Sequence, residues 1–286
     1  MKVITDSAAD LTAEEIETLG ITVAPLEIQF PEGTVSSEDI SRDDFYNRLR
    51  AMWPRIPSTS QPSSGMFTSL YARLAHFKEE MLSIHISSGL SGTINSARLG
   101  AAEMVEVAIE HVDSMTLSGG ERFQVLAAAM ASRAGRNKEF IIERLRQILQ
   151  STEVIYTLET LAYLAKGGRI GRVQALAGAL LHLKPVIHVD KVDGKYSTVG
   201  KERTMQKALN SITEYLYKTY DTQALWVTVL HGQIQAQAEQ LSAMLQARLN
   251  VAKIEILRIS PVLGVHTGPD IVGVAVVPID LMEDLM

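Results

Sequence analysis

The sequence predicts an α/β protein made of two domains. Short apolar runs typical of strands alternate with longer runs at helical spacing along the chain, and this alternation is typical of α/β folds. The 286 residues correspond to about two domains at roughly 150 residues per domain. Because no low-complexity linker interrupts the pattern, we expect two closely apposed domains, residues 1–150 and 151–286.

The elements of the first half follow from apolar spacing and from residues that start or stop helices. Thr12 is a candidate N-cap with Glu15 three residues later and Gly20 as the stop, which predicts a helix over 12–19. Pro54 ends a second helix, at 43–53. The remaining expected elements are strands at 3–5, 21–30 (with a bend at Pro25), 81–86 and 107–112, helices at 66–77, 93–105, 121–134 and 139–149, and polar loops at 55–65 and 87–93.

The second half continues the alternation. Asp193-Gly194 stands between two apolar runs, which predicts a hairpin turn. The other expected elements are strands at 154–157, 185–189, 195–199, 225–230, 254–259 and 271–277, and helices at 158–165, 205–220 and 236–249. Because strands that alternate with helices usually form βαβ units, we expect largely parallel sheets.

Composition excludes several classes of protein. The chain has no cysteine, which excludes disulfides, thiolate zinc sites and cysteine nucleophiles. With 46% hydrophobic and 21% charged residues, intrinsic disorder is excluded as the main state. No apolar run approaches the ~20 residues of a membrane-spanning helix, and the first residues are not typical of a signal peptide. We therefore expect a cytoplasmic location.

The net charge of −6 argues against general binding to nucleic acid. The charge is unevenly distributed, because residues 166–207 contain nine Lys or Arg and three acidic residues. This basic segment is a candidate docking surface for a phosphate-bearing partner or for transient contact with an anionic membrane. A solvated face with no partner is the alternative.

The loop from Ser87 to Thr93 is the strongest local candidate for a binding site. It lies between the end of an expected strand and the start of an expected helix. Open α/β sheets bind ligands at this position, the carboxyl end of a strand. Gly89 and Gly92 let the backbone turn sharply, so consecutive amides can form a nest for an anion. Ser87, Ser88, Ser91 and Thr93 add hydroxyl groups. An ordinary helix cap is the alternative for this loop.

Three further segments carry candidate groups. Thr59 and Ser60 lie in a hydroxyl-rich loop that could serve the same anion or could be a capped turn. His266 stands between Gly264 and Gly268, which predicts an exposed, tightly turned loop whose imidazole could hydrogen-bond or carry a proton. The cations of 166–172 resemble a phosphate loop only loosely, because no Gly-Lys-Ser/Thr ending is present.

Familiar catalytic and metal-binding patterns are missing from the sequence. It contains no Gly-x-Ser-x-Gly and no His-Glu-x-x-His. His76 and Glu79 stand three residues apart, but no neighbouring ligand completes a metal site. We therefore predict no metal and no cofactor.

Taken together, the loops resemble the DegV family. The motifs that carry the resemblance span residues 6 to 270 in the family's order: Asp6-Ser7-Ala8-Ala9-Asp10-Leu11, Thr59-Ser60-Gln61-Pro62, Ser87-Ser88-Gly89-Leu90-Ser91-Gly92-Thr93, Lys166-Gly167-Gly168-Arg169-Ile170, Lys184-Pro185, Gly200-Lys201-Glu202-Arg203-Thr204 and Gly264-Val265-His266-Thr267-Gly268-Pro269. The chain departs from the family at Asp270, where a glycine is usual.

The resemblance implies two α/β domains with one long-chain fatty acid, such as palmitate, bound at their interface. Proteins of this kind are non-catalytic fatty-acid-binding subunits that present the acyl carboxylate to a separate fatty acid kinase, and the kinase supplies ATP and magnesium. Carried over by motif, Thr59 and Ser91 would bind the carboxylate with His266 beside them. The other implied ligand residues are Ser60, Ser88, Gly92 and Arg169, and the implied partner-docking residues are Arg203 and Arg172.

Two other functions are compatible with the same residues. A serine esterase or acyl-transfer enzyme would use Ser91 as the nucleophile and His266 as the base, and it would need the two side chains in hydrogen-bond contact. A phosphosugar- or nucleotide-binding protein would use the glycine loops and their cations. For the fatty acid, residues 175–183 are a candidate tunnel wall, with an ordinary core helix as the alternative.

Overall fold

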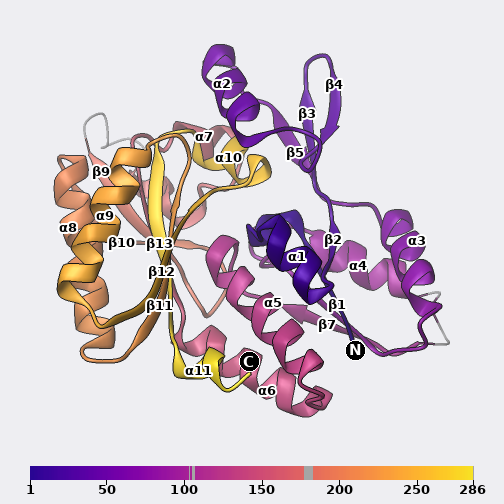
Figure 1. Ribbon diagram of the computed structural model, residues 1–286. Helices are drawn as coiled ribbons and strands as arrows, with labels where there is room; N and C mark the ends of the chain where they lie inside the picture. Colours follow the sequence, from indigo (N-terminus) through magenta and orange to yellow (C-terminus); the bar gives the residue numbers. More distant parts are fainter. Residues whose placement is uncertain (103, 105–106, 177–182, 286) are drawn as a thin grey trace.

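A computed structural model shows a protein built on three sheets (Figure 1). The structure describes residues 1–102, 104, 107–176 and 183–285. The α/β class predicted from the sequence is confirmed. The three sheets occupy different parts of the molecule, and a long helix, α5 (Ser118–Arg133), lies between the two larger ones.

The first sheet is parallel and has the strand order β2-β1-β6-β7. Its helices begin and end largely where capping residues stand: Thr12 and Glu15 form a reciprocal capping box at the start of α1, and Gly20 ends that helix at φ 65°. The elements of this part are β1 (Lys2–Asp6), η1 (Ser7–Ala9), α1 (Ala13–Leu19), β2 (Thr22–Ala24), α3 (Ser64–Ala75), β6 (Met81–His85), α4 (Thr93–Ala101) and β7 (Ile109–Asp113).

Residues 27–60 form a separate unit, which we call the small-sheet unit. It consists of β3 (Glu27–Phe30), β4 (Gly33–Ser36), α2 (Arg42–Met52) and β5 (Ser58–Ser60), and its antiparallel strands have the order β4-β3-β5. The single strand expected at 21–30 is therefore wrong. Pro25, which lacks an amide hydrogen, stands between β2 and β3, where the chain leaves the first sheet.

The second sheet is mostly antiparallel, so the expectation of largely parallel sheets is wrong for this part. Its order is β10-β9-β8-β13-β11-β12, and the pair β11–β12 is parallel whereas the other neighbours are antiparallel. A long helix joins β11 to β12, as in a parallel crossover. Residues 259–270, which include a short helix, then lead into β13, which runs antiparallel to both of its neighbours, β8 and β11. The strands are β8 (Glu153–Leu158), β9 (Lys184–Val189), β10 (Tyr196–Glu202), β11 (Leu225–His231), β12 (Val251–Arg258) and β13 (Ile271–Pro278).

Helices cover both faces of the second sheet. α8 (Met205–Tyr220) and α9 (Gln235–Arg248) pack on the outer face, where Leu209, Leu241 and Val274 belong to one apolar cluster (Figure 1). α5 packs on the inner face. The remaining elements are α6 (Lys138–Ser151), α7 (Ala162–Lys166), η2 (Gly171–Leu176), α10 (Pro261–Thr267) and α11 (Asp280–Glu283).

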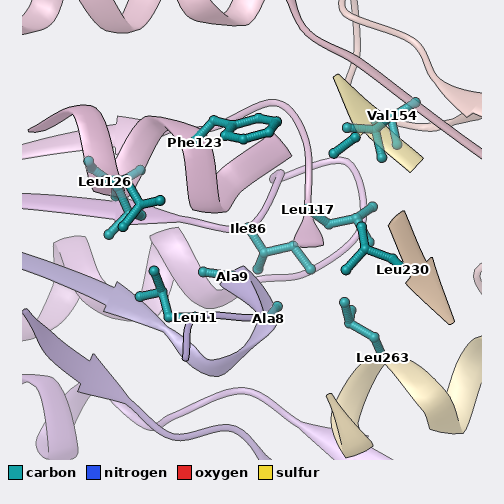
Figure 2. Packing of buried hydrophobic residues seen from close by; sticks show 14 of the residues in the cluster. Ala8, Ala9, Leu11, Ile86, Leu117, Phe123, Leu126, Val154, Leu230 and Leu263 are labelled. Atoms are coloured by element: carbon teal, nitrogen blue, oxygen red, sulfur yellow. The ribbon is translucent and has the colours of Figure 1, made fainter. Parts of the chain in front are cut away.

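One apolar cluster joins the first and second sheets through α5. Phe123 and Leu126 of this helix, Ile86 and Leu11 of the first-sheet side and Leu230 of the second sheet belong to this cluster, and Figure 2 shows Ile86 between Leu126 and Leu230. Because α5 contacts both sheets, it belongs to neither alone. The domain boundary near residue 150 stays a prediction.

Gly119 and Gly120 allow α5 to approach the second sheet closely. A Cβ atom at Gly119 would lie 2.5 Å from Cβ of Ala275, and one at Gly120 would lie 2.5 Å from Cγ2 of Val154. Both distances are shorter than van der Waals contact allows. The absence of a side chain at these positions therefore sets the spacing between the helix and the sheet.

A buried ion-pair network fastens the same helix on both sides. Arg122 is 1% exposed, and its guanidinium donates to Glu15 of α1 and, at 2.7 Å, to Glu255 of β12. It also donates to the Thr228 hydroxyl of β11 at 3.0 Å. One side chain thus connects the helix beside the first sheet to the second sheet.

Candidate functional site

A small cavity lies where the loop after β6, the strand β5 and the helix α10 meet. Its volume is about 30 Å³, which is room for one or two water molecules. The lining combines an apolar group with a polar one: Leu26, Ile86, Leu90, Val262 and Leu263, and Thr59, Ser91, Arg169, Tyr196 and His266. Four residues expected at the binding site are therefore brought together, namely Thr59, Ser91, Arg169 and His266.

Thr59 and His266 are in direct contact. Oγ1 of Thr59 lies 2.7 Å from Nε2 of His266, a hydrogen bond between the small-sheet unit and α10. Thr59 is held in place because β5 pairs with β3, with Thr59 opposite Ile28. Nothing in the polar run Ser58-Thr59-Ser60 indicates a strand, which is why the sequence predicts only a loop there.

His266 is buried in a helix, so the expectation of an exposed, tightly turned loop is wrong. Pro261 occupies the first turn of α10, a position where its missing amide hydrogen costs nothing. Gly264 lies inside this helix, where Phe45 and Tyr46 approach so closely that a Cβ would lie 2.6 Å from a ring carbon of Phe45. Of the two glycines that flank His266, Gly268 is the one with a positive φ, of 79°, and it follows the last residue of the helix.

Burial controls the charge of His266. Removal from water, with a smaller contribution from the positive charge of Arg169, lowers the pKa of His266 to about 4. The imidazole is therefore neutral at neutral pH. Its Nδ1 atom has no hydrogen-bond partner among the described residues.

Ser91 is held by its own loop. Its hydroxyl lies 2.8 Å from Oγ1 of Thr93, and its amide donates to the Ser87 carbonyl at 3.0 Å. The amides of Gly89 and Leu90 are also used within the loop, at Oγ and at the carbonyl of Ser87. These three amides do not point outward as an anion nest, so the hydroxyl of Ser91 is the group this loop offers to a ligand.

Arg169 supplies the positive charge beside the cavity. Its Nη1 donates to the Gly167 carbonyl at 2.7 Å, and its Nε lies 3.4 Å from the Leu90 carbonyl. These two contacts fix the guanidinium between the loop after α7 and the loop after β6. A carboxylate placed next to Thr59 and Ser91 would have this cation as a neighbour.

The other expected ligand residues do not line the cavity. The Ser60 hydroxyl donates to Glu27 at 3.2 Å, on the small sheet. Ser88 is exposed and its amide donates to Asp113 at 3.2 Å. Gly92 faces the Gln61 side chain, because a Cβ at position 92 would lie 2.7 Å from Nε2 of Gln61.

The two residues expected to dock a partner lie in different surroundings. Arg203 is exposed in the turn after β10. Arg172 forms ion pairs with Asp190 at 3.0 Å and Asp193 at 2.9 Å. The charge of the basic segment 166–207 is thus partly compensated, and it is compensated further by the ion pairs Lys184–Glu159 and Lys191–Glu153.

The geometry does not assemble the esterase alternative. Ser91 pairs with Thr93 and His266 pairs with Thr59, so the described contacts do not place the proposed nucleophile and base in hydrogen-bond contact. No acceptor orients Nδ1 of His266 in the described part of the chain. Nor do the described residues bring together three His, Asp or Glu side chains in a way that could hold a metal ion.

Several lining residues have no signal in the sequence. Tyr196 and Leu26 reach the cavity from β10 and from the segment between β2 and β3, which only the tertiary arrangement brings together. The expected tunnel wall at 175–183 lies almost wholly outside the described residues. Among the described residues, no helix combines the length and the apolar character needed to cross a membrane.

Gly167 leaves the space that His266 occupies, although the sequence shows it only as part of a loose phosphate-loop pattern. A Cβ at position 167 would lie 2.2 Å from Nδ1 of His266. The backbone of Gly167 has φ −77°, which any residue adopts. The severe conflict created by a side chain would therefore be with the imidazole, and the Tyr163 carbonyl oxygen would lie 3.2 Å from the same Cβ.

Gly167→Ala is expected to displace His266 and break its contact with Thr59. A displaced, solvated imidazole should titrate nearer its ordinary pKa of ~6.5 instead of about 4, which NMR of the ring protons would measure. In a protein that already carries His266→Ala, adding Gly167→Ala should have little further effect on stability. A His266 pKa that stays at about 4 in Gly167→Ala would contradict this account.

The comparisons with known proteins decide the family. The family model described as "Uncharacterised protein, DegV family" matches residues 1–279. This chain belongs to the DegV family. The resemblance noted in the loop motifs is thereby confirmed over nearly the whole length of the chain.

Relatives within the DegV family match over nearly their full lengths. A DegV domain-containing protein of Deinococcus radiodurans is 35% identical over 277 residues, 96% of this chain and 95% of the relative. A solved structure entitled "Fatty Acid Binding of a DegV family Protein from Thermus thermophilus" matches with a TM-score of 0.91 and 28% identity, covering 97% of this chain and 99% of that one. DegV of Bacillus subtilis, described as a fatty acid binding protein, matches with a TM-score of 0.87 and 28% identity, covering 96% and 98%.

Proposed function

We propose that this DegV-family protein binds a long-chain fatty acid, with the carboxylate at Thr59, Ser91, Arg169 and His266. The observation that carries the proposal is the hydrogen bond between Thr59 and His266 at the polar end of an otherwise apolar cavity. A buried carboxylate needs several donors, and hydroxyl groups next to a cation provide them. The fatty acids bound by the Thermus and Bacillus relatives support the same ligand class.

The acyl chain would gain about 0.8 kcal/mol for each methylene group removed from water. The cavity of about 30 Å³ that the described residues enclose does not accommodate such a chain. Entry of the chain therefore requires the apolar side chains around Leu26, Leu90 and Leu263 to move apart. The displacement of these side chains costs part of the gain.

We further propose that the bound fatty acid is presented to a separate kinase, which supplies ATP and magnesium, and that this chain does no chemistry and needs no cofactor of its own. The exposed Arg203 is the better docking candidate of the two arginines, because Arg172 is engaged by two aspartates. Exchange of the lipid would involve transient contact with an anionic membrane. Arg203→Glu should abolish acyl phosphorylation by the kinase without changing fatty acid affinity, and unchanged phosphorylation would reject this docking role.

Organic extraction followed by mass spectrometry tests the ligand class, and binding of added palmitate tests the site. Thr59→Val and Ser91→Ala are each expected to weaken binding about tenfold or more, because each removes a hydrogen bond to a charged group. Ser58→Ala is the matched control, since Ser58 lies on the same strand and its hydroxyl donates to Gln29, outside the cavity. Absence of any bound or added acyl chain would reject the proposed function, and unchanged affinity in both variants would reject the head-group assignment.

A further inference from the structure

The small-sheet unit is attached to the rest of the molecule mainly at α10. An apolar cluster joins Phe45 and Leu49 of α2 to Val265 of α10. The Tyr46 hydroxyl donates to the Ile259 carbonyl at 3.2 Å. Figure 1 shows this unit projecting from the molecule above α7 and α10. Its position relative to α10 determines whether Thr59 meets His266.

Arg50 of α2 makes a set of polar contacts across the boundary between the small-sheet unit and the rest of the molecule. Its Nη2 and Nη1 donate to the two carboxylate oxygens of Asp270, at 2.5 and 3.3 Å. Its Nε donates to Oε1 of Gln233 at 2.7 Å, and Gln233 donates back to Asn47 of α2 at 2.7 Å. The planar guanidinium thus holds two residues that lie beyond the small-sheet unit, one of them in a two-point contact.

The ion pair between Arg50 and Asp270 lies close to the binding site along the chain. Asp270 lies four residues after His266, directly before β13, and Arg50 lies on the helix that packs against α10. The pair Arg50–Asp270 therefore joins the same two parts of the molecule as the pair Thr59–His266. The cavity that the described residues enclose is too small for an acyl chain, and Thr59 lines it from the small-sheet unit, so separation at this boundary would widen the way in and out.

We propose that Arg50 and Asp270 form a latch that sets how fast the fatty acid enters and leaves, which rests on the proposed function. In this proposal the ion pair opens while the chain passes and forms again once the chain is bound, so that its contribution is the same in the free and the bound protein. Removing it should raise the association and the dissociation rate by the same factor and leave the Kd unchanged. Loss of Thr59, in contrast, changes the Kd because that contact is made to the ligand.

The expected change in the rates follows from how exposed the side chains of the ion pair are. The side chains of Arg50 and Asp270 are 45% and 31% exposed, and ion pairs in water-accessible positions change an equilibrium by about two- to fivefold. The pair Arg258–Asp43 at 2.8 Å also joins α2 to the second sheet. Asp43 is 77% exposed and contacts Arg258 through Oδ1, whereas Asp270 uses both carboxylate oxygens, so removal of Asp43 should change the rates less.

Stopped-flow measurement of a fluorescent fatty acid tests the latch in Arg50→Gln, Asp270→Asn and the double variant. Each single variant should bind and release the ligand about two- to fivefold faster at constant Kd, and the double variant should be no faster than the singles because one interaction has been removed. The matched control is Arg248→Gln, which breaks a similarly exposed ion pair with Glu214 far from the cavity. Rates equal to those of the control would overturn the latch.

Hydrogen exchange in the absence of fatty acid separates this inference from the proposed function. The amides of β3 and β5 should exchange faster in Arg50→Gln and Asp270→Asn than in the parent and the Arg248→Gln control. If the parent protein binds no fatty acid, the proposed function fails and the assignment of the latch to lipid exchange fails with it. If the parent binds but neither the rates nor the exchange change, the latch alone is rejected.

Discussion

Arg122→Met is expected to lower the free energy of unfolding by about 3–5 kcal/mol, because it leaves two acids without their buried partner. The guanidinium of Arg122 is shared by Glu15 and Glu255, and the Thr228 hydroxyl donates to the same oxygen of Glu255 at 2.9 Å. Methionine fills a similar volume but supplies no charge and no donor. Urea denaturation followed by circular dichroism would measure the loss.

Two further variants make the expected result specific to this network. Adding Glu255→Gln to Arg122→Met should recover part of the lost stability, since it removes one of the uncompensated charges. Arg248→Met, which breaks the exposed ion pair with Glu214, should cost less than about 1 kcal/mol. Equal losses for Arg122→Met and Arg248→Met would mean that the buried network contributes no more than a surface pair.

Gly119→Ala is expected to destabilise the protein by about 1–3 kcal/mol, although alanine normally favours a helix by about 1 kcal/mol over glycine. The added methyl group would lie 2.5 Å from Ala275 Cβ and 3.0 Å from Leu230 Cδ1. Ala275 is on β13, in the middle of the second sheet, and its Cβ cannot turn away. Packing therefore outweighs helix propensity at this position.

Gly65→Ala is the matched control for this result. Gly65 is also in a helix, α3, and a Cβ there would meet nothing closer than 3.9 Å. The substitution should therefore stabilise the protein by about 0.5–1 kcal/mol. Thermal unfolding of both variants would show opposite shifts in Tm. A stabilised Gly119→Ala would mean that α5 does not press on β13 as described.

Local signals in the sequence predict the elements that local chemistry controls. The capping box of Thr12 and Glu15 and the stop at Gly20 are confirmed, and the helix at 205–220 has the bounds expected from its apolar spacing. The hairpin at Asp193-Gly194 is confirmed by the antiparallel pair β9–β10. The DegV-family resemblance rests on motif order along the chain, so it does not require knowing how the loops are arranged in space.

Features that depend on distant pairing are not predicted from the sequence. β5 is a strand because β3 pairs with it, and the mixed direction of the second sheet follows from the place of β13. Glycines on both sides of His266 predict a loop there because glycine is typical of turns. Gly264 is a glycine for another reason, the close approach of Phe45 and Tyr46 from more than 200 positions earlier.

The position of β13 has a consequence for how the protein folds during synthesis. Every strand of the first sheet lies within residues 2–113, so this sheet can form while later residues are still being made. The second sheet cannot close, because its inner neighbours β8 and β11 await a strand that leaves the ribosome after all the others. Until then, two apolar strand edges are open to pairing with other chains. The period just before β13 emerges is therefore when the nascent second sheet is most open to aggregation.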